Sequence, residues 1–265
     1  MPSLRFPNPA SGVEADLAAF LSEVPSGAVV ELAPGRFRGP LRIERPVTIK
    51  GAGDLTRIEG DGRSPVVSVD AASAGLVYFE SLTIAEGAGL RGGGLSVEAG
   101  RVRLFNVLVR DCRADDAGGG IWVGGGELEA RLLRLHGLSA DRGGAVGVGG
   151  EGRFAIFDGQ VHESHARVGG GACFVEGARV KLSGVTFGRT RASGAAGGQV
   201  LWVGAATDGA LLVELERVRF EDVPLGQPLV VQPERPGRIT LFECDVPSSV
   251  FGNPGIVDGG NNTWR

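Results

Sequence analysis

The sequence predicts an all-β solenoid in which each repeat of about 26 residues forms one coil and equivalent strands stack into three parallel sheets. Three observations predict this fold. Glycine pairs recur before apolar residues at a nearly constant step. Every repeat contains the same order of three short alternating stretches. A single amphipathic helix lies near the N-terminal end, where it can cover the first coil.

The glycine pairs define the repeat. They begin the segments GGGLSV, GGGIWV, GGAVGV, GGGACF and GGQVLW. The first apolar residue after each pair marks steps of 26, 25, 26 and 28 residues, at Leu95, Ile121, Val146, Ala172 and Val200. Five matches at this spacing predict a repeat architecture instead of a flexible glycine-rich linker.

Each repeat contains three stretches in which apolar and polar residues alternate. Examples are Leu95–Val97, Val102–Leu104 and Val107–Val109. Period-two alternation predicts strands with one buried face. The segment before each glycine pair is longer than a hairpin loop, which favours a coil over an antiparallel meander. Eight or nine coils at a spacing of about 4.8 Å would form a rod about 40 Å long.

The two ends of the chain differ from the repeats. Residues 13–24 place Val13, Leu17, Phe20, Leu21 and Val24 on one face of a helix, which we expect to cap the rod. We expect coils over residues 27–250. A turn-rich tail follows over 251–265, with Trp264 placed to cover the last coil. The whole chain, 1–265, is predicted to form one domain.

Composition narrows the classes of function. The 46 glycines far exceed an average share of about 7%. The net charge of −4 and the lack of a basic block argue against nucleic-acid binding. Three widely spaced cysteines form no disulfide framework. The sequence contains no apolar stretch of 18 residues, so membrane insertion is not predicted. We expect a cytoplasmic location for the chain as written, and an extracellular one if a leader was removed.

The N-terminal segments GAVVELAPGRFRGPLRIERPVTIKGAG (27–53) and TRIEGDG (56–62) resemble the opening coils of periplasmic copper-maturation and carbohydrate-binding β-helix proteins. The later glycine-pair repeats are similar to those of β-helix adhesins. Together they resemble the right-handed parallel β-helix, or pectin-lyase-like, superfamily over essentially the whole chain. This resemblance implies a right-handed parallel β-helix. It implies no single activity, because the superfamily contains lyases, hydrolases, esterases, adhesins and scaffolds.

Charged residues near the glycine pairs form a candidate catalytic edge, for which we assign Asp116, Asp141, His162 and Arg167. A lyase of this fold needs a Ca²⁺-binding acidic cluster and a base, and a glycoside hydrolase needs two carboxylates. The alternative is structural, because Asp and Arg stacked on neighbouring coils relieve like-charge repulsion. The sequence also lacks the catalytic triplets of polygalacturonases and the Arg-x-Pro-x-x-Arg segment of pectate lyases.

Trp122 is a candidate ligand-binding residue. Alternation places Ile121 and Val123 inside and Trp122 outside, beside Ser96 and Gly147, so we expect a flat aromatic surface suited to sugars. The same alignment places Cys173 in this outward row. We add to the binding set Asp115, His136 and His165. His162 and His165, three apart in an extended chain, point to opposite faces, so no metal site is predicted.

Three functions remain open at this stage. The first, which we favour because the catalytic motifs are missing, is a non-catalytic binding or scaffold protein with a glycan- or protein-binding face. The second is a polysaccharide lyase or glycoside hydrolase acting at the charged edge. The third is a structural component of a larger assembly. No cofactor is predicted, except that the lyase alternative implies Ca²⁺.

Overall fold

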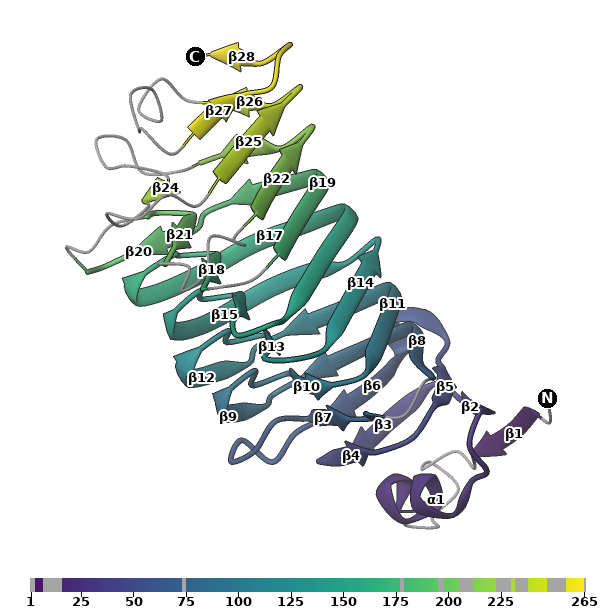
Figure 1. Cartoon of the computed structure of the whole chain (residues 1–265). Helices are drawn as coiled ribbons and strands as arrows, with labels where there is room; N and C mark the ends of the chain where they lie inside the picture. The colour runs from purple at the N-terminus through teal and green to yellow at the C-terminus, as the bar shows by residue number, and fades with distance from the viewer. Residues whose placement is uncertain are drawn as a thin grey trace.

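The computed structural model of the chain is a parallel β-solenoid of about 8 turns, which confirms the predicted fold class (Figure 1). It describes residues 3–6, 16–72, 75–176, 179–194, 198–204, 212–222, 230–231, 238–246 and 256–264. The coils stack along the rod from the helix near the N-terminus to the last strands near the C-terminus.

Within the described residues, one side of the solenoid is a sheet of eight short strands from successive coils. The strands between Leu95 and Val203 start just after the glycine corners. The members of the sheet are β4 (Leu41–Ile43), β7 (Val67–Asp70), β10 (Leu95–Ala99), β13 (Ile121–Val123), β16 (Val146–Val148), β18 (Cys173–Val175), β21 (Leu201–Val203) and β24 (Val230–Val231).

The other sides belong to one sheet of 20 strands, because its long strands run through the bends between sides. Its members are β1 (Ser3–Phe6), β2 (Ala28–Leu32), β3 (Gly35–Arg38), β5 (Val47–Lys50), β6 (Thr56–Glu59), β8 (Leu76–Ala85), β9 (Ala88–Arg91), β11 (Arg101–Arg110), β12 (Arg113–Ala117), β14 (Glu127–Arg131), β15 (Arg134–Arg142), β17 (Arg153–Gly169), β19 (Arg179–Gly188), β20 (Arg191–Ala192), β22 (Leu212–Glu216), β23 (Arg219–Glu221), β25 (Arg238–Phe242), β26 (Asp245–Val246), β27 (Ile256–Asp258) and β28 (Thr263–Trp264).

Each middle coil turns at residues with a left-handed backbone. In the coil of β11 these are Asn106 (φ 52°), Asp111 (φ 53°) and Gly118 (φ 65°). Asn and Asp tolerate this conformation better than most residues, and glycine adopts it without a steric penalty. At Gly118 a side chain is also excluded by packing, since a Cβ would lie 2.7 Å from the backbone nitrogen of Gly147 in the next coil. The glycine pairs therefore serve the corners of the coil.

The core runs along the axis as columns of stacked inward residues. One column contains Leu95, Ile121, Val146, Cys173 and Leu201, all at most 3% exposed. Stacking of this kind buries each coil against its two neighbours.

The expectation that Cys173 faces outward is therefore wrong. The backbone hydrogen bonds align Ala172 with Ala145 and Val200 with Ala172, in the row that begins at Gly94 and Gly120. Ala172 and Val200 thus occupy the last position of the corner, where earlier coils have a glycine or Ala145. The sequence alignment took the first apolar residue after each glycine pair as the first strand residue. In the coils of Ala172 and Val200 this choice shifts the alternation by one residue, which exchanges the inward and outward faces of the strand.

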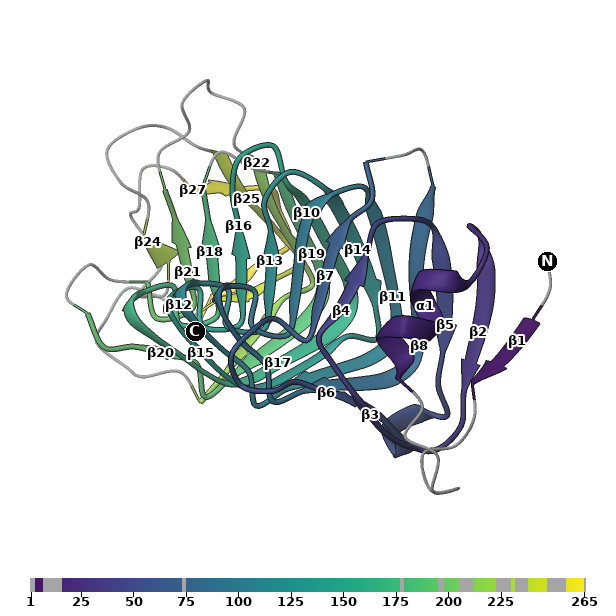
Figure 2. The same ribbon diagram turned by 90° about the horizontal axis from the view of Figure 1, so that it is seen from below.

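The N-terminal end is closed by α1 (Leu17–Glu23), which lies in front of the first coils in the view from below (Figure 2). The helix starts later than residue 13 because the Asp16 side chain accepts hydrogen bonds from the backbone of Ala18 and Ala19, as a helix N-cap does. Residues 13–15 of the expected helix lie outside the described residues. Leu17 and Leu21 are buried, as a capping helix requires.

Strands also extend the ladder at both ends. β1 pairs in parallel with β2, and Phe6 packs edge-on against Phe20 of the helix at 5.0 Å between ring centroids. β27 and β28 stack on β25 and β26. The coil pattern therefore continues past residue 250 into the segment expected to be a tail.

Candidate functional site

Trp122 points outward, between Ser96 and Gly147 as predicted, but it is not an exposed surface. The side chain is only 5% exposed. It forms a small apolar cluster outside the main core with Ala117, Phe174 and the partly buried Trp202. The ring lies over Gly147 and Gly149, where a Cβ would meet indole carbons at 2.8 and 2.6 Å. The exposed, flat aromatic surface expected at Trp122 is therefore not present.

Two arginines cover this outer aromatic cluster. The Arg91 guanidinium lies 4.6 Å from the Trp122 ring centroid, and that of Arg142 lies 4.5 Å from the Phe174 ring. Asp116 joins the two arginines: its carboxylate accepts from Arg91 Nε at 2.7 Å and from Arg142 Nε at 3.1 Å. The sequence alone could not show that these arginines lie over the aromatic rings. Arg91 and Arg142 belong to different coils, and their positions relative to the rings depend on the register between coils.

These contacts set the charge state of Asp116. Burial alone would raise the pKa of this carboxyl, but the hydrogen bonds from Arg142 and Arg91 outweigh it and hold the pKa below 3.8. A general acid at neutral pH needs a raised pKa. Asp116 is thus a clamped carboxylate that holds two guanidinium groups over aromatic rings.

Two other members of the charged edge are paired with each other. Asp141 accepts a hydrogen bond from Arg167, and this bond raises the pKa of Arg167, with a smaller contribution from the charge of Asp115. The alternation of Asp and Arg between coils agrees with the structural alternative for this edge.

The three histidines are divided by the corner at Glu163 (φ 53°). His136 and His162 are in-register neighbours on β15 and β17, before the corner. His165 lies after it, with Nε2 at 2.6 Å from Ser193 Oγ. Burial, followed by the charge of Arg191, lowers the pKa of His165 below 6.5. His162 is therefore separated from Asp116, Asp141 and Arg167, and the four assigned catalytic residues do not form one cluster.

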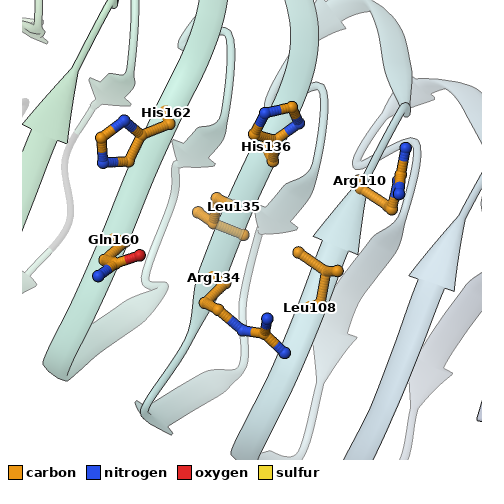
Figure 3. Close-up of a pocket in the computed structure, with 7 residues that line it drawn as sticks. All are labelled: Leu108, Arg110, Arg134, Leu135, His136, Gln160 and His162. Carbon is orange, nitrogen blue, oxygen red and sulfur yellow. The ribbon is translucent and has the colours of Figure 1, made fainter. Parts of the chain in front are cut away.

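His136 and His162 instead line a shallow groove of about 390 Å³ on the outer face of β11, β15 and β17 (Figure 3). Its remaining lining residues are Leu108, Arg110, Arg134, Leu135 and Gln160. We call these seven residues the basic groove. The polar members come from three successive coils: Arg110 is in register with His136, and Arg134 is in register with Gln160.

The residues that line the basic groove are cationic or neutral, whereas the acids that pair with them lie outside the lining. The lining includes two arginines and two histidines and, among the described residues, no carboxylate. The acids that pair with these groups belong to neighbouring segments. Asp111 accepts from Arg110 Nε at 2.6 Å, and Asp54 accepts from Arg134 Nη1 at 3.1 Å. Glu163 lies 3.3 Å from His136 Nε2.

Sequence reasoning identified the two histidines of the groove but missed its arginines and Gln160. A usable signal was present: the left-handed corner residues Asp111 and Glu163 each directly follow the row that contains Arg110 and His162. Counting back from those corners, instead of from the glycine pairs, aligns the groove residues.

Other chemistry is limited in the part of the chain that the structure describes. No group of three or more His, Cys, Asp or Glu side chains there is placed to hold a metal ion. Burial raises the pKa of the Cys112 thiol to about 11 and that of Cys173 to about 12, so both are poor nucleophiles at neutral pH. None of the described helices has the length and apolar character needed to cross a membrane.

Comparison with known proteins finds no matching family model, no matching curated protein and no matching solved structure.

Proposed function

We propose that this chain is a non-catalytic binding protein of the parallel β-helix type, and that the basic groove holds an anionic glycan. The observation that carries this proposal is the lining itself: Arg110, Arg134, His136 and His162 face one groove whose described lining residues include no acid. Arginine and histidine donate charge-assisted hydrogen bonds to carboxylate and sulfate oxygens.

The shape of the groove also suits an extended ligand. Its polar residues repeat from coil to coil at a spacing of about 4.8 Å, so a chain lying along the rod meets a donor at each step. The partly exposed Leu108 adds apolar contact area within the same groove, whereas the Leu135 side chain is buried in the core. A small, enclosed ligand would need a deeper pocket that buries most of its surface.

The clamped state of Asp116 supports the non-catalytic part of the proposal. Its two oxygens are engaged by Arg91 and Arg142, and its pKa is held low, so Asp116 does not serve as a general acid at neutral pH. The alternative, a polysaccharide lyase or glycoside hydrolase, remains an outcome of the test. It predicts unsaturated or reducing ends when the protein is incubated with polygalacturonate.

The test is equilibrium binding of polygalacturonate and dextran sulfate at pH 7.5, with neutral dextran as the comparison ligand. We expect both anionic glycans to bind and dextran not to bind. Arg134→Ala removes a donor from the groove and is expected to weaken binding about tenfold, the effect of losing one charged hydrogen bond of about 1.4 kcal/mol.

Arg103→Ala is the matched control. Arg103 carries the same charge on β11 but lines a different groove, with Tyr78 and Phe105. We expect this variant to bind as the unmodified protein does. Equal weakening by Arg134→Ala and Arg103→Ala would show that net charge alone drives binding, and the absence of binding to either anionic glycan would refute the proposal.

A further inference from the structure

We propose that His136 and His162 make the basic groove a pH-dependent binding site, which holds anionic glycans more tightly in mildly acidic conditions and releases them as pH rises. This inference rests on the proposed function and adds regulation to the same site. It depends on the two histidines, which are in register on neighbouring strands, and not on the arginines alone.

The register places the two histidines in neighbouring positions on one outer face. His136 of β15 pairs directly with His162 of β17, so their backbones are about 4.8 Å apart and both side chains lie on the outer face (Figure 3). Gly188 follows His162 in the same row, so no side chain covers His162 from the next coil at this position. A Cβ at Gly188 would lie 2.5 Å from the His162 ring. The His162 ring therefore lies over Gly188, in space that a side chain at this position would fill.

The charges that face this pair come from every neighbouring strand. Arg110 of β11 precedes His136 in the row, and Arg134 lies two residues before it on β15. Glu163 lies 3.3 Å from His136 Nε2 and is shared with Arg189 Nη1, at 2.8 Å. Asp111 and Asp54 pair with Arg110 and Arg134, and Glu221 follows Gly188 in the row. The uncharged neighbours are Gln160 and Thr186.

Protonation changes the balance of these charges. Imidazoles gain their charge between about pH 8 and pH 5. Glu163 can offset the charge of His136, but it already accepts from Arg189. A second imidazolium at His162 then shares the groove lining with two guanidiniums and His136, and no acid belongs to that lining. An anion bound in the groove compensates this charge, and so it favours the protonated form of both rings.

The sign of the effect follows from linkage. Because the bound state takes up protons, affinity rises as pH falls, by at most tenfold per pH unit for each proton taken up. We expect the dissociation constant for dextran sulfate to fall about tenfold or more between pH 7.5 and pH 5.5. Dextran sulfate is the probe because its sulfates do not titrate in this range, so any change belongs to the protein.

The experiment compares the full chain with the double variant His136→Gln/His162→Gln. Glutamine keeps a polar side chain of similar length at two positions outside the core. We expect the double variant to bind as the unmodified protein does at pH 7.5 and about tenfold more weakly at pH 5.5. His165→Gln is the matched control, since it removes the third histidine beyond the corner, and it should retain the full pH dependence.

A second measurement does not depend on any variant. Calorimetric titration of dextran sulfate at pH 6.5 in two buffers of different ionisation enthalpy counts the protons taken up on binding. Net uptake is expected. Zero uptake, or an unchanged pH dependence in the double variant, would overturn the inference. If the pH dependence is flat while Arg134→Ala still weakens binding, the proposed function stands without this regulation; if dextran sulfate binds at no pH, both fail.

Discussion

Replacing Trp122 with alanine tests whether the outer aromatic cluster stabilises the solenoid or serves a ligand. The indole is 5% exposed and is covered by the Arg91 guanidinium at 4.6 Å. A tryptophan buries roughly 150–250 Å². At about 25 cal/mol per Å² this burial stabilises the folded chain by roughly 4–6 kcal/mol, an upper estimate because unfolded chains already bury some surface.

The expected loss is smaller than that upper estimate. The ring lies on the outside of the sheet, over Gly147 and Gly149, so water can fill the space that alanine leaves, and no empty cavity is added to the cost. The Arg91 side chain is 44% exposed, and its cation–π contact contributes about 0.5–1 kcal/mol. We therefore expect Trp122→Ala to lower the free energy of unfolding by about 3 kcal/mol.

Thermal unfolding followed by circular dichroism measures this loss. For a chain of this length, about 3 kcal/mol corresponds to a decrease in Tm of roughly 6–12 °C. Phe105→Ala is the control, because Phe105 also points outward from a strand but is 38% exposed; its Tm should fall by less than about 3 °C. A similar, small effect of both substitutions would refute the structural role of Trp122. Loss of glycan binding in a stable Trp122→Ala protein would restore the ligand-binding hypothesis.

Two further predictions concern the charged edge and the corners. Asp116→Asn removes the charge that joins Arg91 and Arg142 and should destabilise the fold by about 2 kcal/mol at pH 7. Because the pKa of Asp116 is lowered in the folded state, this stabilisation is present above pH 3.8 and is lost progressively as the pH falls below it. The urea midpoints of the variant and the unmodified protein should therefore converge in strong acid. A difference that stays constant with pH would contradict the charge argument. Gly118→Ala should cost clearly more than the 1–2 kcal/mol of left-handed strain expected for Gly62→Ala, because Gly62 has open space around its Cβ position and Gly118 does not; equal losses in urea unfolding would show that packing at the corner does not matter.

The solenoid was predictable from the sequence because the repeat can be recognised from residue spacing along the chain. The step between glycine pairs and the period-two alternation within Leu95–Val97 or Val102–Leu104 are both visible in one dimension. The N-terminal helix was also predictable from its apolar face. Its start at Leu17 was not, because it depends on a single capping interaction of Asp16.

The candidate site depended on register, which the tertiary structure alone decided. A corner of variable composition, with Gly120 in one coil and Ala172 in another, was enough to exchange the faces assigned to Cys173. The exposure of Trp122 could not be predicted from the sequence either. Alternation correctly directed Trp122 outward, but only the folded chain brings Arg91 from the preceding coil over its ring.

What the sequence by itself determined is therefore the repeating coil, its inward apolar residues and its capped end, because these follow from local periodicity. Only the tertiary structure decided which charged residues meet. It joined Asp116 to two arginines. It also placed His136 and His162 with Arg110 and Arg134 in one groove, separated by a corner from Asp116 and Asp141. The physical reason is that neighbours along the rod are about 26 residues apart in the chain, so a shift of one residue changes every partner.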